Sequence, residues 1–130
     1  MPSALPGGEL EIAVLRALWD LGHASTRELH ERVGAPAGLV YTTVAKVLDR
    51  LHAKRLVARR KQGKAFVYRP RAKRADVERA RAETTLNSIF GSEPRPAIAT
   101  LVEAVEAIDP ELLEELARAV ARRRKDRDGS

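Results

Sequence analysis

The pattern of apolar and polar positions predicts a two-faced helix over Gly38–Lys54 (GLVYTTVAKVLDRLHAK). Its apolar stripe, which can pack on a core, consists of Val40, Val44, Val47, Leu48 and Leu51. Its opposite face carries hydroxyl groups and cations, on Tyr41, Thr42, Thr43, Lys46 and Arg50. Short donors near the N-terminus and cations further along suit a helix in a DNA major groove. An ordinary amphipathic surface helix is the competing interpretation.

Two helices are predicted before this one. Glu9–Leu21 is apolar around most of its circumference, which is typical of a central core helix. Ser25 and Glu28 form the S-x-x-E pattern of a capping box, so a second helix is expected over about Thr26–Val33. Its first turn offers backbone N–H groups and the hydroxyls of Ser25 and Thr26 to a phosphate. A helix cap without ligand binding is the simpler interpretation of Ser25.

A turn and a hairpin complete the N-terminal pattern. Gly34–Gly38 (GAPAG) joins the second helix to the two-faced helix, which makes a helix-turn-helix. Leu56–Lys61 and Ala65–Arg69 are β-prone runs joined by a glycine-containing turn. The cations on the first strand and the tip are Arg59, Arg60, Lys61 and Lys64. Such a basic hairpin is a wing that can lie along the sugar-phosphate backbone, and Phe66 and Tyr68 should pack back on the helices.

Charge strengthens the nucleic-acid interpretation. The 130 residues carry a net charge of +6, and all of the excess lies in residues 1–70. Lys46–Arg74 contains 12 cations and a single acid, Asp49. A polyanionic partner explains this imbalance, because each phosphate that is neutralised releases counterions. With 44% hydrophobic but only 4% aromatic residues, the core must be aliphatic and mostly helical.

The C-terminal part reads as three helices, over Asp76–Phe90, Ala97–Ala107 and from Pro110 to about Arg124, with a frayed basic tail at Arg122–Arg127. Short helices with one apolar stripe each bury too little surface alone, so a second copy of the chain is the expected partner. The residues expected at this dimer interface are Leu86, Ile89, Phe90, Ile98, Leu101, Val102, Val105, Leu112, Leu113, Leu116 and Val120. A two-fold dimer also matches an inverted-repeat site.

The predicted fold is mainly α with a small β-hairpin, divided into four parts. These are a disordered lead (1–8), a winged-helix DNA-binding domain (9–71), a helical dimerisation region (72–124) and a disordered basic tail (125–130). The absence of cysteine excludes disulfides and thiol chemistry and fits a cytoplasmic protein. The chain shows neither a signal peptide nor a spanning segment, so no membrane partner is expected. His23, His30 and His52 lie on separate elements, so neither an enzyme nor a cofactor is expected.

Residues 9–70 resemble the penicillinase and methicillinase repressor family of bacterial winged-helix regulators. The matching motifs are Leu10-Glu11…Leu18-Trp19, Ala24-Ser25-Thr26-Arg27-Glu28, Tyr41-Thr42-Thr43-Val44…Leu48-Asp49-Arg50-Leu51 and Tyr68-Arg69-Pro70. The resemblance implies a homodimeric repressor bound to an inverted-repeat promoter operator. It also assigns base contacts to Thr42, Thr43 and Lys46, backbone or groove-edge contacts to Tyr41 and Arg50, and wing contacts to Lys61 and Lys64.

The chain departs from the family pattern at three places. Arg55 stands where the family often has a glycine, so a turn that favours positive φ is either held by a costlier residue or has a different shape. Thr100-Leu101 aligns with the Asn-Phe bond that is cut in β-lactam-responsive members. The cysteines of copper-responsive relatives are absent. The inducer or protease that would release this chain from DNA is therefore unknown.

A second function class stays open at the level of sequence. A winged-helix module with a basic face can also bind RNA or an acidic protein without reading a DNA sequence. The hydroxyls of Thr42 and Thr43 beside Lys46 favour groove readout. Equally tight binding to any polyanion would favour the module.

Overall fold

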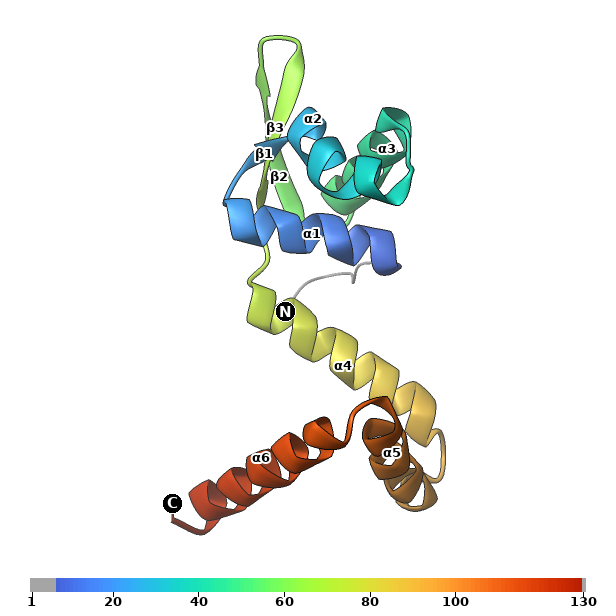
Figure 1. The fold of residues 1–130 in the computed structure, drawn as a ribbon. Helices are drawn as coiled ribbons and strands as arrows, with labels where there is room; N and C mark the ends of the chain where they lie inside the picture. Colours follow the sequence, from blue (N-terminus) through green and yellow to red (C-terminus); the bar gives the residue numbers. More distant parts are fainter. Residues whose placement is uncertain (1–6, 130) are drawn as a thin grey trace. The chain divides into compact units, whose positions relative to one another are not determined.

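The computed structural model describes residues 7–129 and divides the chain into two compact units, with the boundary between Glu83 and Thr84 (Figure 1). Of the predicted disordered lead, residues 1–6 lie outside the described part. Gly8 is the N-cap of the first helix, and the Gly7 N–H donates to the Glu11 carboxylate. Within residues 7–129 no helix is both long and apolar enough to cross a membrane.

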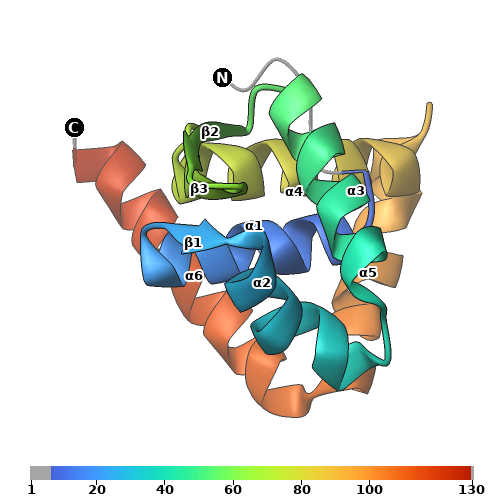
Figure 2. The same cartoon turned by 90° about the horizontal axis from the view of Figure 1, so that it is seen from above.

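The first unit combines helices with a three-stranded antiparallel sheet, a mainly helical winged-helix fold as predicted. Its elements are α1 (Glu9–Leu21), β1 (Ala24–Ser25), α2 (Thr26–Leu29), η1 (His30–Gly34), η2 (Ala35–Ala37), α3 (Tyr41–Ala53), β2 (Val57–Gln62), β3 (Ala65–Pro70) and the first half of α4 (Arg74–Phe90). The sheet order is β1-β3-β2. Seen from above, α1 lies beside β1 and α2 (Figure 2).

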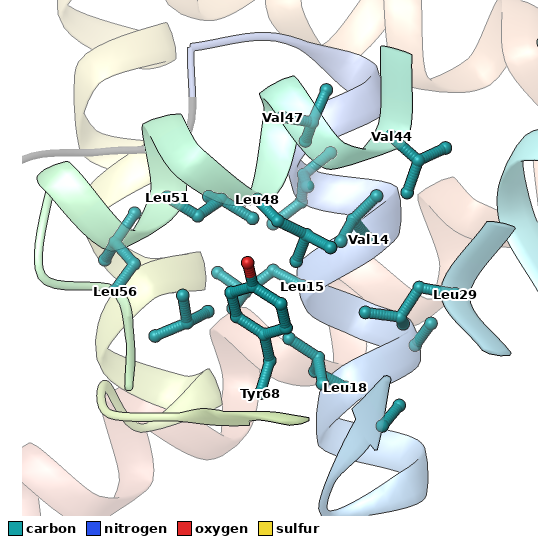
Figure 3. Packing of buried hydrophobic residues seen from close by; sticks show 14 of the residues in the cluster. Val14, Leu15, Leu18, Leu29, Val44, Val47, Leu48, Leu51, Leu56 and Tyr68 are labelled. Carbon is teal, nitrogen blue, oxygen red and sulfur yellow. The ribbon is translucent and has the colours of Figure 1, made fainter. Parts of the chain in front are cut away.

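The core of this unit is aliphatic, as the composition predicts, and α1 and α3 supply most of it (Figure 3). The fully buried residues of α3 are Val44, Val47, Leu48 and Leu51. They share one helix face because three- and four-residue spacings return to the same side. From the hairpin, Tyr68 reaches into the same core and is 2% exposed.

The predicted apolar stripe of α3 is one residue too long. Val40 was expected in the stripe, but it is the extended N-cap of α3 and is 63% exposed. The helix therefore begins at Tyr41. With this start, Tyr41 and Thr42 lie in the first turn of the helix, where both are exposed.

The second predicted helix is wrong in its C-terminal half. The α-helical part ends at Leu29, and the chain continues through a π-helical turn at His30–Gly34 and a 3₁₀ turn at Ala35–Ala37. Gly34 is buried against the side chain of Val44, at a distance that leaves no room for a Cβ atom. This close approach of Gly34 to α3 explains why residues 30–37 do not continue the regular α-helix that ends at Leu29.

The hairpin forms as predicted, with Gln62 opposite Ala65 and Gly63 in the turn at φ 65°. The two-residue strand β1 was not predicted and pairs with β3 through Ala24 opposite Tyr68 and Ser25 opposite Val67. Phe66 lies beyond this third strand and is 37% exposed. The prediction that Phe66 packs on the helices is therefore wrong, whereas the prediction for Tyr68 is confirmed.

The second unit consists of the end of α4 together with α5 (Pro94–Ile108) and α6 (Pro110–Gly129). The prediction of a disordered basic tail from residue 125 is wrong, because α6 continues through these basic residues to Gly129. Arg and Lys favour helices, and the spacing of Arg122 from Asp126 permits a stabilising i,i+4 pair.

None of residues 84–129 is buried, although α5 and α6 contact each other. The residues predicted for the dimer interface divide into two groups by exposure. The half-buried group is Leu86, Phe90, Leu101, Val105, Leu113 and Leu116. The exposed group is Ile89, Ile98, Val102, Leu112 and Val120.

Candidate nucleic-acid interface

The polar face of α3 is accessible as the sequence predicts. Tyr41, Thr42, Lys46 and Arg50 are exposed and Thr43 is half-buried, while the opposite side of the helix is fully buried in the core. Thr42, Lys46 and Arg50 follow one another at four-residue spacing, so they form a row along the helix. The row places a hydroxyl nearest the helix N-terminus, followed by an ammonium and a guanidinium group, an arrangement that suits contact with a DNA groove.

The N-terminus of α3 is electrostatically suited to an anion. Its N-cap, Val40, supplies no side-chain hydrogen bond, and the first turn contains no acid. The free backbone N–H groups of a first turn and the helix dipole together give this end a partial positive charge. A phosphate beside Tyr41 would therefore be stabilised by backbone groups as well as by the exposed side chains of this turn.

His30 fixes the chain just before α3. Its Nε2 lies 2.8 Å from the Leu39 carbonyl oxygen, and its ring meets the ring of Tyr41 edge to face at a centroid distance of 6.0 Å. His30 is half-buried, whereas the sequence analysis treated the histidines as residues without a site role. No sequence motif signals this function, because it depends on the π-helical turn that brings His30 to Leu39.

The C-terminus of α3 is held by a buried charge. Glu11 of α1 is 7% exposed, and its Oε1 accepts from the Lys54 Nζ at 2.9 Å while its Oε2 accepts from the Gly7 N–H. The next residue, Arg55, has φ 62° and is the single non-glycine residue with positive φ in the described range. Of the two alternatives that the sequence leaves for Arg55, the structure shows the costlier residue in a turn with positive φ. The turn directs the chain from α3 into the hairpin.

The start of α2 is less open to a phosphate than predicted. Ser25 and Glu28 form the full capping box, with the Glu28 N–H donating to Ser25 Oγ and the Ser25 N–H donating to Glu28 Oε1. These bonds, with the backbone bond first, lower the pKa of Glu28 and keep its carboxylate ionised. Thr26 is 7% exposed, so the expected phosphate contact by its hydroxyl is not supported.

The hairpin cations do not all face the same way. Opposed residues in the register share a face, so Lys61 lies on the side of Phe66 and Arg60 on the side of Val67. Lys64 lies in the turn, and all three cations are exposed. The tip and both sides of the wing are therefore basic.

Arg59 is the hairpin cation that differs from the others. Its Nη1 donates to Asp49 Oδ1 of α3 at 2.9 Å, and its guanidinium lies 4.4 Å from the centroid of the Phe66 ring. A side-chain hydrogen bond with Tyr68 and, less strongly, the interaction with Asp49 raise the pKa of Arg59, against the opposing effect of burial. Arg59 is thus directed towards α3 and not outwards.

An open hollow of about 300 Å³ lies on the hairpin, with Ala58 and Val67 in its lining. Its lining also includes His23, Tyr68 and three arginines, Arg59, Arg60 and Arg69. The positive charges of Arg60 and Arg69 suit anionic oxygen atoms of a backbone that passes the wing. Within residues 7–129 there is no group of His, Asp and Glu side chains placed to hold a metal ion.

Comparison with known proteins identifies the family. Residues 7–122 match the family model described as "Penicillinase repressor". The transcriptional regulator BlaI of Mycobacterium tuberculosis, strain CDC 1551 / Oshkosh, is 35% identical over 115 residues, which cover 88% of this chain and 82% of that protein. The protein of the same name from strain ATCC 25618 / H37Rv gives the same values. The chain belongs to the penicillinase repressor family.

A solved structure supports the fold of this repressor. The solution structure of the DNA binding domain of the repressor BlaI superposes with a TM-score of 0.51 at 24% sequence identity. The match covers 57% of this chain and 92% of that domain. The chain is thus a DNA-binding transcriptional repressor of the winged-helix type and not an enzyme, as the sequence analysis predicted.

Proposed function

We propose that the chain represses transcription in the cytoplasm as a homodimer on an inverted-repeat operator. In this proposal α3 is the recognition helix, with Thr42, Thr43 and Lys46 at base edges and Tyr41 and Arg50 at the groove edge. The wing cations Arg60, Lys61 and Lys64 contact the sugar-phosphate backbone. The observation that carries the proposal is the exposed row on α3, which begins at an uncapped helix N-terminus and lies on the same unit as a basic hairpin.

The dimer part of the proposal rests on the second unit. A monomer would leave five apolar side chains of the predicted interface exposed, among them Ile98 at 50% and Ile89 at 47%. Covering them with the same surface of a second copy removes apolar area from water. A two-fold axis through this unit would relate two recognition helices and match an inverted repeat.

Replacing Lys46 with Ala should weaken binding to the operator by about 1–3 kcal/mol more than binding to random DNA. The reason is its position in the middle of the exposed row on α3. Fluorescence anisotropy with operator and scrambled duplexes of equal length measures both affinities. Equal losses on the two duplexes would contradict a base-reading role for Lys46.

Replacing Lys64 with Ala should lower both affinities and reduce the salt slope by about one, since a lysine that neutralises one phosphate releases about one counterion. The measurement is the dependence of the binding constant on salt concentration. Lys125 of α6 is a control with the same charge change, outside the proposed interface, and Lys125→Ala should leave the slope unchanged. An unchanged slope for Lys64→Ala would remove the wing tip from the interface.

Selection of bound genomic fragments by the purified protein, at a salt concentration that suppresses non-specific binding, tests the proposed function as a whole. We expect one enriched inverted repeat, whose location names the regulated genes. Enrichment of no motif, with similar affinity for RNA and DNA, would replace the proposal with the general polyanion-binding module.

We further propose that release from DNA does not use cleavage at the family position. Thr100-Leu101 lies in the middle of α5, with Leu101 half-buried against the rest of the second unit. A protease binds its substrate as an extended strand, so this bond becomes a substrate only after local unfolding of α5. A ligand or another protease site is the expected route.

A further inference from the structure

The hairpin is anchored only at its base. Strand β1 pairs with β3 at Tyr68 and Val67 and reaches no further towards the tip. From Phe66 to the turn the hairpin is a two-stranded ribbon, which alone is marginally stable and bends easily. In Figure 1 this part projects beyond the helices of its unit. Its direction relative to α3 must therefore be set by side-chain contacts near the base.

Arg59 makes such contacts where the anchored and projecting parts meet. It lies opposite Tyr68, the residue that also pairs with β1, and its Nη1 reaches Asp49 on α3 at 2.9 Å. Its guanidinium also covers the ring of Phe66, the first β3 residue beyond the third strand. One side chain thus joins the recognition helix, the anchored base and the projecting ribbon.

The distribution of charge distinguishes the Arg59–Asp49 pair from the other cations of the wing. The stretch Lys46–Arg74 contains 12 cations and one acid, Asp49. Of these cations, Asp49 pairs with Arg59, whose side chain is only 26% exposed. Arg60, the next residue along β2, is exposed on the opposite face and makes no ion pair within residues 7–129. An arginine that binds a phosphate is expected to be exposed and unpaired like Arg60. For Arg59, the carboxylate of Asp49 at 2.9 Å would compete with a phosphate for the guanidinium.

We propose that Arg59 is a positioning residue, which holds the wing at a fixed angle to the recognition helix through Asp49 and Phe66 and does not itself contact DNA. Gln62 at the end of β2 lies three residues beyond Arg59, about 10 Å along the strand, and Lys64 lies in the turn that follows it. A tilt of about 15° at Arg59 therefore moves the wing tip by about 3 Å, enough to separate an ammonium group from its phosphate. The inference rests on the proposed function and adds a determinant of specificity to it.

The test compares the wild-type chain with Arg59→Met, Asp49→Asn and the double variant on the selected operator and on a random duplex. Each single variant should reduce the ratio of operator to random affinity about three- to tenfold. The double variant should lose no more than the worse single variant, since both substitutions break one contact. Arg59→Met should leave the salt slope unchanged.

Arg60→Met is the matched control, because it removes the same charge one residue along the strand. It should reduce the salt slope by about one. A salt slope reduced by about one for Arg59→Met would overturn the proposal and make Arg59 a phosphate contact, and an unchanged ratio of operator to random affinity for Asp49→Asn would overturn it as well.

Asp49→Asn decides the question even if Arg59→Met fails to fold, because Asp49 is 66% exposed and the substitution keeps the stacking on Phe66 in place. Failure of the proposed function can be distinguished from failure of this inference, because in that case the wild-type chain would select no operator.

Discussion

Replacing Gly34 with Ala should destabilise the protein by about 3 kcal/mol, at the upper end of the range for overpacking. A Cβ atom at this position would lie 2.6 Å from Val44 Cγ2 and 2.7 Å from His30 Cδ2. The first contact is with a fully buried, branched side chain of α3 that has no space to move away. The backbone conformation of Gly34, φ −76° and ψ −54°, suits any residue, so the effect is one of space alone.

Chemical denaturation of the full chain measures this loss. Gly129→Ala is the control, since Gly129 is exposed at the end of α6 with no atom within 4 Å of an added Cβ, and its effect should stay within about 0.5 kcal/mol. Gly34→Ala should also weaken operator binding, because relief of the clash shifts α3 relative to α2. Unchanged stability would show that α3 packs less tightly on the π-helical turn than the structure indicates.

The features that could be predicted from the sequence are those set by residues within a single helix. The bounds of α1 and the four buried residues of α3 follow from periodicity, and the capping box at Ser25 follows from two residues three apart. In each case the signal is local, so tertiary contacts had little to change.

The elements that were missed depend on contacts between distant residues. The π-helical turn needs Gly34 against Val44 and His30 against Leu39, and none of these pairs has a sequence signature. Strand β1 has only two residues and exists because β3 offers an edge beside it.

The candidate site shows the same limit. The sequence predicts that the hairpin carries several cations, but only the strand register shows that Arg59 lies on the face of Tyr68 and Arg60 on the face of Val67. A shift of one residue would exchange their faces. The composition therefore predicts a basic wing, whereas the function of each cation depends on its partner in the fold.

Replacing Val102 with Asp should break the proposed dimer. Val102 is an apolar residue of α5 that is 37% exposed, so the contacts of its own chain leave part of its side chain open to a partner. In a two-fold interface the substitution occurs on both copies, and burial of unpaired carboxylates should cost about 3–5 kcal/mol. The dissociation constant should rise at least about a hundredfold. Leu116, half-buried within its own unit, would be a poorer choice because its loss also disturbs α6.

Sedimentation velocity over a range of concentrations measures the change, and circular dichroism checks that the helices remain. Ala104→Asp introduces the same residue two positions along α5, on the other side of the helix, and should leave the dimer intact. If Val102→Asp sediments as the wild type does, the exposed stripe is not the interface. If it becomes monomeric and also loses the operator, the second unit acts by holding two recognition helices at the spacing of an inverted repeat. A monomer that keeps full operator affinity would instead place sequence recognition in the first unit alone.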